Sequence, residues 1–485
     1  MAAPAEFLQY IDANADAFIQ RLADAVAIPS ISGDAKRRGD VVRMAHWLND
    51  QLKALGVDTK LVDLGKQVLD GQELDLPPAI LGTLGQDPAK KTVLIYGHFD
   101  VQPANKSDGW NTDPFTLVVN KENGQLIGRG SSDDKGPILG WLNVLQYHHE
   151  KGIPLPVNLK FCFEGMEESG SEGLDELVQN EAKPGGYFHG VDCACISDNY
   201  WLNTRTPVLT YGLRGLTYFK VTVSGPARDL HSGVFGRTVH EPMTDLVHLL
   251  GRLVDTQGNI LVPGVEEMVA PADEQEKAIY QKLDYSTTDI EEAAGNTIAL
   301  TSDKVDLLMG RMRNPSLSLH GIEGAFSEPG AKTVIPAKVS GKFSIRIFCI
   351  DWYPPQTPEA VDPLVIAYLK SEYAKLNSKN TLTIENLHGG KPWVADHTHW
   401  NFEAAKKATK AVYKQDPDLT REGGSIPVTL TFAESLGVNV LLLPMGRGDD
   451  GAHSTNEKLD RSNFIEGSKL LGSYLYELAA LTKNQ

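Results

Sequence analysis

The sequence contains few cysteines and no long hydrophobic run, and both scarcities narrow the classes of protein that it can encode. No stretch reaches the roughly 18 apolar residues that a membrane-spanning helix needs. Four cysteines occur among 485 residues, and three of them lie in apolar runs, which favours buried reduced thiols over disulfides. Residues 1–26 lack the basic segment and the continuous apolar core of a secretory signal, and their apolar spacing predicts one amphipathic helix instead. We therefore expect a cytoplasmic protein with no membrane partner.

Positive charge is also scarce. Lysine and arginine number 46 against 63 aspartates and glutamates, for a formal charge of −17, and no basic cluster offers an electrostatic surface for nucleic acid. The sequence has neither a P-loop nor a G-x-S-x-G motif, so nucleotide hydrolysis and nucleophile-elbow serine hydrolysis lack their usual marks. The segment GRGDDG, residues 446–451, fits the G-x-G-x-x-G spacing. Its two aspartates would repel a pyrophosphate, so a dinucleotide site is not expected.

The length and the order of apolar patterns predict two structural units. A chain of 485 residues exceeds one hydrophobic core. Alternating strands and helices over residues 1–210 and again over 391–485 predict an α/β fold with a mostly parallel sheet flanked by helices. Between them, residues 211–390 show half-buried alternating strands and two helices, which predicts an inserted α+β domain with an antiparallel sheet. Residues 258–294 are acidic and are expected to be exposed.

Histidine and carboxylate side chains follow several of the predicted strands. The side chains at the strand ends of an open α/β sheet converge on a common crevice, so one joint site is expected. In extended chain, His98 and Asp100 project to the same face, and a carboxylate placed there can orient a metal-binding imidazole. The full set consists of His98, Asp100, Asp133, Asp134, Glu167, Glu168, Asp198 and His453.

Each member of this set also has an ordinary interpretation. A single carboxylate after a strand usually caps a helix or faces solvent, and His453 alone is more typical of a polar histidine with satisfied hydrogen bonds. Together they form a nitrogen and oxygen donor set without cysteine, which suits zinc, manganese or cobalt. Four further histidines are expected on the solvated surface: His148, His149, His397 and His399.

The adjacent glutamates Glu167 and Glu168 are the most informative pair. They follow the apolar run VNLKFCF, residues 157–163, where an uncompensated buried carboxylate costs several kcal/mol. A cation nearby would remove that cost. Because neighbouring residues in a strand point to opposite faces, a turn is required for both side chains to reach one site.

Eight motifs give the chain a specific resemblance. In order they are HFDVQP (98–103), GRGSSDDKGP (128–137), GMEESGSEG (165–173), ISDNYW (196–201), DLHSGVFG (229–236), GAKTVIP (330–336), GGSIPVTL (423–430) and GAHSTNEKL (451–459). The sequence resembles the carnosinase and cytosolic nonspecific dipeptidase branch of the dinuclear zinc metallopeptidases, including the fungal Cys-Gly metallodipeptidases.

The resemblance implies two divalent metal ions per subunit, Zn or Mn. Asp133 would bridge the ions, with His98 and Asp198 completing one site and Glu168 and His453 the other. Two such ions bring a charge of +4, and three ligand carboxylates with a bridging hydroxide balance it. Glu167 is then left to act as general base for the bridging water, while Asp100 orients His98.

The same resemblance implies that the inserted domain is a lid that also forms a homodimer. His231 would reach the neighbouring subunit's site and stabilise the oxyanion. Arg346 would bind the C-terminal carboxylate of the substrate, supported by Thr333 and Ser425. Without the resemblance, His231 could equally be a turn residue and Arg346 an exposed strand residue.

The function implied is a metal-dependent dipeptidase for short L-peptides with a free C-terminus, with Cys-Gly from glutathione degradation as the favoured substrate. Two alternatives stay open. One is an N-acyl amino acid hydrolase or carboxypeptidase of related mechanism, and the other is a non-enzymatic, metal-binding dimeric scaffold. Glu167 argues against the scaffold, because a scaffold needs ligands but no base.

Overall fold

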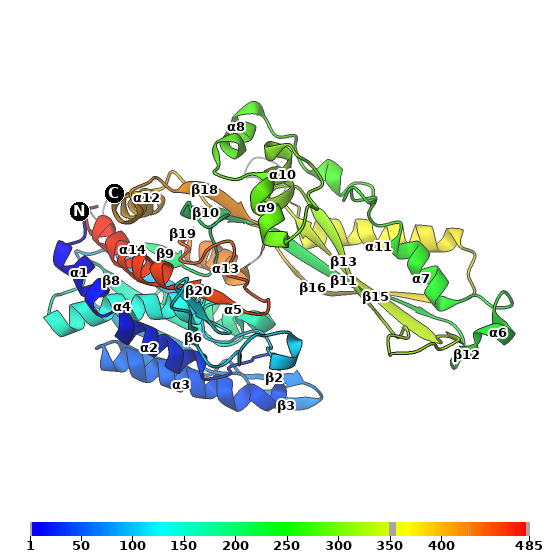
Figure 1. The fold of residues 1–485 in the computed structure, drawn as a ribbon, viewed down its shortest axis with the longest axis horizontal. Helices are drawn as coiled ribbons and strands as arrows, with labels where there is room; N and C mark the ends of the chain where they lie inside the picture. Colours follow the sequence, from blue (N-terminus) through cyan, green and yellow to red (C-terminus); the bar gives the residue numbers. More distant parts are fainter. Residues whose placement is uncertain (1, 349–355, 425, 482–485) are drawn as a thin grey trace.

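Two sheets of different architecture organise the chain, which the computed structural model describes for residues 2–348, 356–424 and 426–481 (Figure 1). The chain leaves the first sheet at the end of β10 (Val208–Leu213) and enters the second with β11 (Gly215–Ser224). It returns to the first sheet at β17 (Trp393–Val394). Both termini lie on the side of the first sheet, near α1 (Ala5–Ala13) and α14 (Arg461–Ala479).

The first sheet has nine strands and a parallel centre. Its strand order is β1-β4-β8-β5-β9-β19-β10-β17, with β18 paired to β10. The central strands β8, β5, β9 and β19 run parallel, whereas β1, β4 and β17 pair antiparallel at the edges. The predicted mostly parallel sheet is therefore confirmed. The bounds not yet given are β1 (Asp58–Val62), β4 (Ala79–Leu84), β5 (Thr92–His98), β8 (Asn158–Glu164), β9 (Cys193–Ile196), β18 (Asp418–Glu422) and β19 (Asn439–Leu442).

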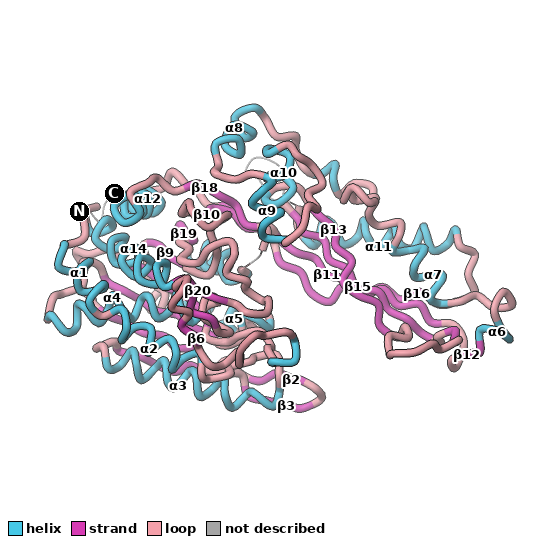
Figure 2. Tube along the Cα trace, in the orientation of Figure 1, coloured by secondary structure: helices cyan, strands magenta, loops and turns pink. Residues whose placement is uncertain are grey.

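Helices cover both faces of this sheet, as Figure 2 shows in helix and strand colours. One face packs in a single hydrophobic cluster against α1, α2 (Ala15–Val26), α3 (Arg38–Ala54), α4 (Lys135–Lys151), α12 (Trp400–Tyr413) and α14. The other face packs against α5 (Leu174–Glu181) and α13 (Pro427–Leu436). Burial of both faces explains why the central strands read as continuous apolar runs rather than alternating ones. The described cysteines, Cys162, Cys193 and Cys195, are buried and unpaired.

The single helix predicted over residues 1–26 is in fact two helices, which meet at Asn14. The Asn14 side-chain amide donates a hydrogen bond to the Tyr10 carbonyl, 2.9 Å away. Asparagine competes in this way with backbone hydrogen bonds and favours helix ends. The apolar spacing continues across the break, since Ile11, Ala15 and Phe18 are all buried. The periodicity therefore identified the buried face but not the interruption.

The second sheet is antiparallel, as predicted, with strand order β13-β15-β11-β16. Its other strands are β13 (Ser316–Glu323), β15 (Lys338–Ile347) and β16 (Thr381–Gly390). Helices α7 (Pro242–Leu250) and α11 (Pro358–Lys375) pack on one face. At the end far from the first sheet, β12 (Leu230–His231) pairs with β14 (Val334–Ile335) beside α6 (Ser232–Phe235) (Figure 1).

The acidic segment 258–294 is mostly exposed, as predicted, but it also contributes buried residues to a hydrophobic cluster. Helices α8 (Glu274–Lys282) and α9 (Thr287–Ala294) lie in this segment, and α10 (Lys304–Met312) follows it. Tyr280 and Tyr285 are buried against Trp201 of the first unit. Two of the acidic residues, Asp284 and Asp289, accept hydrogen bonds from the Arg205 guanidinium. The acidic composition therefore predicted the exposed residues of this segment but not its buried tyrosines.

Shorter elements complete the fold. They are β2 (Lys66–Leu69), β3 (Gln72–Asp75), β6 (Val118–Val119), β7 (Gln125–Ile127), β20 (Lys458–Asp460) and the 3-10 turns η1 (Ala35–Arg37), η2 (Lys106–Asp108), η3 (Glu167–Ser169) and η4 (Glu266–Met268). Among the described residues, no helix combines the length and apolarity needed to cross a membrane.

Candidate metal centre and active site

The carboxyl ends of three adjacent parallel strands carry the first candidate residues. His98 is the last residue of β5, Glu167 and Glu168 follow β8, and Asp198 follows β9. Asp133 lies just before α4, and His453 lies in the loop between β19 and β20. Because β8, β5 and β9 are neighbours in the sheet and run parallel, their carboxyl ends lie side by side at one edge.

The side chains form two groups of three that could each hold a metal ion. In the first, the ligand atoms of His98, Glu167 and Asp198 lie within 4.8 Å of one another. In the second, Asp133, Glu168 and His453 meet the same limit. The structure thus brings together every residue that the resemblance implied as a metal ligand.

Asp133 connects the two groups through its two carboxylate oxygens. Its Oδ1 lies 3.1 Å from His98 Nε2, and its Oδ2 lies 3.2 Å from His453 Nε2. His98 Nε2 also lies 3.6 Å from Asp198 Oδ2, and His453 Nε2 lies 3.0 Å from Glu168 Oε2. One carboxylate that faces two donor groups with separate oxygens has the arrangement needed to bridge two cations.

Asp100 contacts three of these residues from beneath the site. Its carboxylate oxygens accept the backbone N–H groups of Glu167, at 3.2 Å, and Glu168, at 3.1 Å. Its Oδ1 also lies 3.3 Å from His98 Nδ1. The glutamates lie in η3, which is the turn that their joint use requires. Asp100 therefore contacts both the His98 imidazole and the backbone of η3. The sequence predicted only the contact with His98.

Burial and the crowding of carboxylates favour proton uptake at the site. Burial raises the pKa of Glu167 well above its usual value, and the nearby carboxylates of Asp198 and Glu168 raise it further. Hydrogen bonds with Asp133 and Glu168 raise the pKa of His453 to about 11. No cation compensates the carboxylates of these described residues. The raised pKa values mean that bound protons neutralise the negative charge instead.

The donor set fits divalent cations. In the part of the chain that the structure describes, the carboxylates at the centre form ion pairs with His98 and His453 rather than with lysine or arginine. Imidazole nitrogens and carboxylate oxygens without cysteine suit zinc or manganese. A third acidic group, Asp449, Asp450 and Asp460, differs because the Lys458 ammonium lies within 2.9 Å of an oxygen of each. That ammonium already supplies the cation there.

Three further candidate residues lie in the second unit, outside both donor groups. His231 in β12 and Thr333 beside β14 are exposed at the far end of the second sheet, where Ser232 N–H donates to the Thr333 carbonyl. Arg346 in β15 is half-buried, and it pairs across the sheet with Leu216. Ser425 lies outside the described residues. The chain alone therefore does not bring His231 and Thr333 to its own metal groups.

Asp134 is a site residue to which the sequence assigned no role. Its Oδ2 accepts the backbone N–H of His98 at 3.2 Å, and it is buried. A side chain at Gly97 would collide with that carboxylate, because a Cβ there would lie 2.7 Å from Asp134 Oδ2. Gly97, directly before His98, was the sequence feature that could have indicated this close approach of Asp134.

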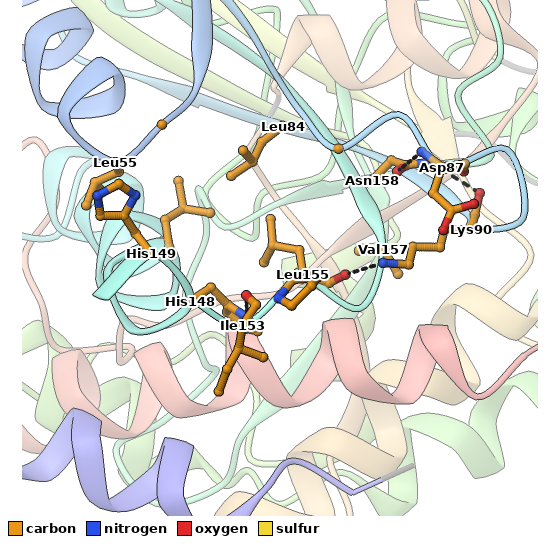
Figure 3. Close-up of a pocket in the computed structure, with 14 residues that line it drawn as sticks. Leu55, Leu84, Asp87, Lys90, His148, His149, Ile153, Leu155, Val157 and Asn158 are labelled. Atoms are coloured by element: carbon orange, nitrogen blue, oxygen red, sulfur yellow. Dashed lines mark hydrogen bonds between the residues drawn. The ribbon is translucent and has the colours of Figure 1, made fainter. Parts of the chain in front are cut away.

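A separate pocket of about 380 Å³ lies at the opposite, amino-terminal ends of β5 and β8 (Figure 3). Leucine side chains line it, and Asn158 and Lys90 form its polar rim. His148, predicted on the solvated surface, is buried there, with Nδ1 3.1 Å from the Ile153 carbonyl oxygen, whereas His149 is exposed. On α4, His148 packs against the rings of Tyr147 and Tyr476, so its surface assignment was wrong.

Comparisons with known proteins identify the family of the chain. A family model described as peptidase family M20/M25/M40 matches residues 94–477. The chain is 54% identical over 474 residues to a Cys-Gly metallodipeptidase of Schizosaccharomyces pombe, covering 98% of each. It is 45% identical over 476 residues to the human Beta-Ala-His dipeptidase, covering 98% of this chain and 92% of the relative.

A solved structure of a dipeptidase from Saccharomyces cerevisiae aligns with a TM-score of 0.92 at 52% identity, covering 98% of both chains. The fold class and the resemblance carried by the eight motifs are both confirmed by these matches. The chain therefore belongs to peptidase family M20/M25/M40.

Proposed function

We propose that this protein is a metal-dependent dipeptidase that hydrolyses short L-peptides with a free C-terminus, Cys-Gly foremost. The observation that carries the proposal is the pair of donor groups, which Asp133 connects and the first of which contains Glu167. Asp133, His98 and Asp198 would hold one divalent ion, and Asp133, Glu168 and His453 the other. Two ions, zinc or manganese, would supply the positive charge that acidifies water and polarises the peptide carbonyl.

Glu167 is the proposed general base. Its Oε2 lies 4.0 Å from His98 Nε2, at the edge of the first donor group. A carboxylate there takes a proton from the attacking water and passes it to the leaving amine. Asp100, through its hydrogen bond to the Glu167 backbone, fixes where that carboxylate stands.

His231 is the proposed oxyanion donor, supplied by a second copy of the chain in a homodimer. His231 Nδ1 accepts the Gly233 N–H at 3.0 Å, so a neutral imidazole carries its proton on Nε2 and can donate outward. Val234 and Val239, beside it, are 63% and 38% exposed. Exposed apolar side chains around a polar donor suit a surface that a partner covers. We propose that residues 211–390 form this lid and dimerisation domain.

Arg346 is the proposed ligand for the C-terminal carboxylate of the substrate, with Thr333 and Ser425 in support. Replacing it with methionine is expected to lower kcat/KM for Cys-Gly about 10–100-fold, because a charge-assisted hydrogen bond contributes roughly 1.5–3 kcal/mol. For a C-terminally amidated dipeptide, which lacks the carboxylate, the same substitution should lower kcat/KM much less. Lys342→Met, on the same strand, serves as the control variant. An equal loss on the acid and the amide would contradict the role of Arg346.

A substrate panel tests the proposed function. The purified protein, loaded with Mn²⁺ or Zn²⁺, is expected to cleave Cys-Gly and Ala-Gly, with slower cleavage of β-Ala-His and none of acetylated amino acids. The Cys-Gly and Beta-Ala-His names of the relatives support this order. Cleavage of the acetylated compound alone would favour the N-acyl amino acid hydrolase alternative. Metal binding without any turnover would favour the scaffold. With Cys-Gly as substrate, we propose a role in glutathione degradation in the cytoplasm.

A further inference from the structure

Two loops that are far apart in the sequence carry the bridging Asp133 and the second-group ligand His453. The first loop, residues 128–134, leads from β7 into α4, and the second, residues 443–457, leads from β19 into β20. Strands β20 and β7 pair antiparallel, with Lys458 opposite Ile127. This pairing brings the two loops together directly beside the metal groups.

Glu457 occupies the junction between these loops. Its side chain is completely buried, yet it belongs to neither donor group. Its Oε1 accepts the backbone N–H groups of Gly130, Ser132 and Asp133, at 3.1, 3.0 and 3.0 Å. One carboxylate thereby gathers the amides of the loop that ends in Asp133, as an anion does in a backbone nest.

Arg129 completes the junction. Its guanidinium Nη1 donates to Glu457 Oε2 at 2.7 Å, and its Nη2 donates to the Ser454 carbonyl oxygen at 3.1 Å. Ser454 is the residue after His453. Arg129 is itself buried, 3% exposed. The pair thus links the backbone of Asp133 to the loop that carries His453, through fixed hydrogen bonds at both ends.

We propose that Glu457 is a positioning residue, which acts with Arg129 to hold Asp133 and His453 in the geometry that two metal ions require. This proposal rests on the proposed function above. The two Asp133 oxygens can face different histidines only if the Asp133 backbone is fixed in orientation and the His453 loop is fixed against it. Glu457 performs the first task, and Arg129, through Ser454, performs the second.

A glutamine at position 457 would keep the volume but not the pattern of acceptors. Both carboxylate oxygens face only donors: the backbone amides on one side and the Arg129 guanidinium on the other. Whichever way the amide is turned, its NH₂ group faces another donor. The variant therefore loosens the junction without removing any metal ligand.

The test measures metal binding rather than turnover alone. Metal-free wild-type protein and Glu457→Gln are titrated with Mn²⁺ by calorimetry, with exposed Glu434→Gln as the matched control. We expect two ions per wild-type subunit and a 10–100-fold weaker Kd for at least one ion in Glu457→Gln. Excess Mn²⁺ should restore kcat, with KM for Cys-Gly little changed.

A purely structural role would give a different result. It would lower the unfolding temperature of the metal-free protein but leave the Mn²⁺ affinity of the folded molecules at the wild-type value, and this outcome would overturn the proposal. If Glu457→Gln does not fold, Arg129→Lys decides. It keeps a positive charge opposite Glu457, but a single ammonium cannot reproduce the guanidinium fork toward Ser454, so Mn²⁺ should again bind about tenfold more weakly. Wild-type affinity in that variant would refute the positioning role, whereas a wild-type protein that binds no metal would refute the proposed function instead.

Discussion

Replacing Glu167 with glutamine is expected to lower kcat for dipeptide hydrolysis about 10²–10⁴-fold, the range that a positioned general base contributes. The glutamine keeps the size of the side chain and its place in η3, where Asp100 holds the backbone N–H. It cannot accept a proton from water at neutral pH. KM for Cys-Gly should change little, because the carboxylate is assigned to proton transfer and not to binding.

The metal content of this variant separates two roles for Glu167. Its carboxylate lies in the first donor group with His98 and Asp198, so geometry alone would also allow a ligand role. If Glu167 is the base, Glu167→Gln should retain two metal ions per subunit by elemental analysis and lose activity. If it is a ligand, metal should be lost together with activity. The exposed Glu176→Gln, on α5, controls for the loss of one negative charge.

Glu168→Gln is expected to lose metal together with activity, in contrast to Glu167→Gln. Glu168 Oε2 lies 3.0 Å from His453 Nε2 and also accepts a hydrogen bond from Gln102, at 2.7 Å. As a ligand of the second group, it should lose affinity for one ion, and excess metal should recover part of the activity. Glu167→Gln should show no such recovery. Two neighbouring glutamates would then have separate functions.

The central part of this site was predictable because each residue follows a strand that the sequence marks clearly. The β5 segment is buried at every position, so its apolar run predicted a central strand and placed His98 at its carboxyl end. The same argument placed Glu167, Glu168 and Asp198. The turn needed for both glutamates followed from the alternation of side chains along a strand, and η3 supplies it.

The remaining features depend on contacts between distant segments, which local patterns do not encode. Glu457 has no function visible in its own loop, because its partners are the Arg129 guanidinium and the amides of Gly130, Ser132 and Asp133. The burial of Tyr280 and Tyr285 depends on Trp201, which lies far away in the sequence. The helix breaks at Asn14 because its side chain competes with the backbone for the Tyr10 carbonyl. The apolar spacing continues across the break and therefore does not reveal it. The metal roles, His231 and Arg346 came from the resemblance, since spacing alone left their alternatives open.

Mixing two inactive variants is expected to restore activity, because the proposed active site takes residues from two subunits. His231 lies in β12, at the far end of the second sheet from the strand ends that carry the metal groups (Figure 1). His231→Ala alone should lower kcat about 10²–10³-fold, as the loss of an oxyanion donor does. In a mixed dimer with Glu167→Gln, one site has both its own Glu167 and the partner's native imidazole. One of the two sites in each mixed dimer is complete, so the mixed dimer, once separated from the two parent dimers, should show about half of wild-type activity.

The experiment uses co-expressed, differently tagged variants, with the mixed dimer purified over both tags and assayed with Cys-Gly. A mixture of Glu167→Gln with Glu168→Gln is the matched control. Each subunit supplies both glutamates to its own site. Neither site in that mixed dimer is therefore complete, and activity should stay low. Recovery with His231→Ala but not in the control requires His231 to act across the dimer. A mixed dimer as inactive as its parents would mean that His231 acts within its own chain, and a fully active His231→Ala parent would mean that His231 has no catalytic role.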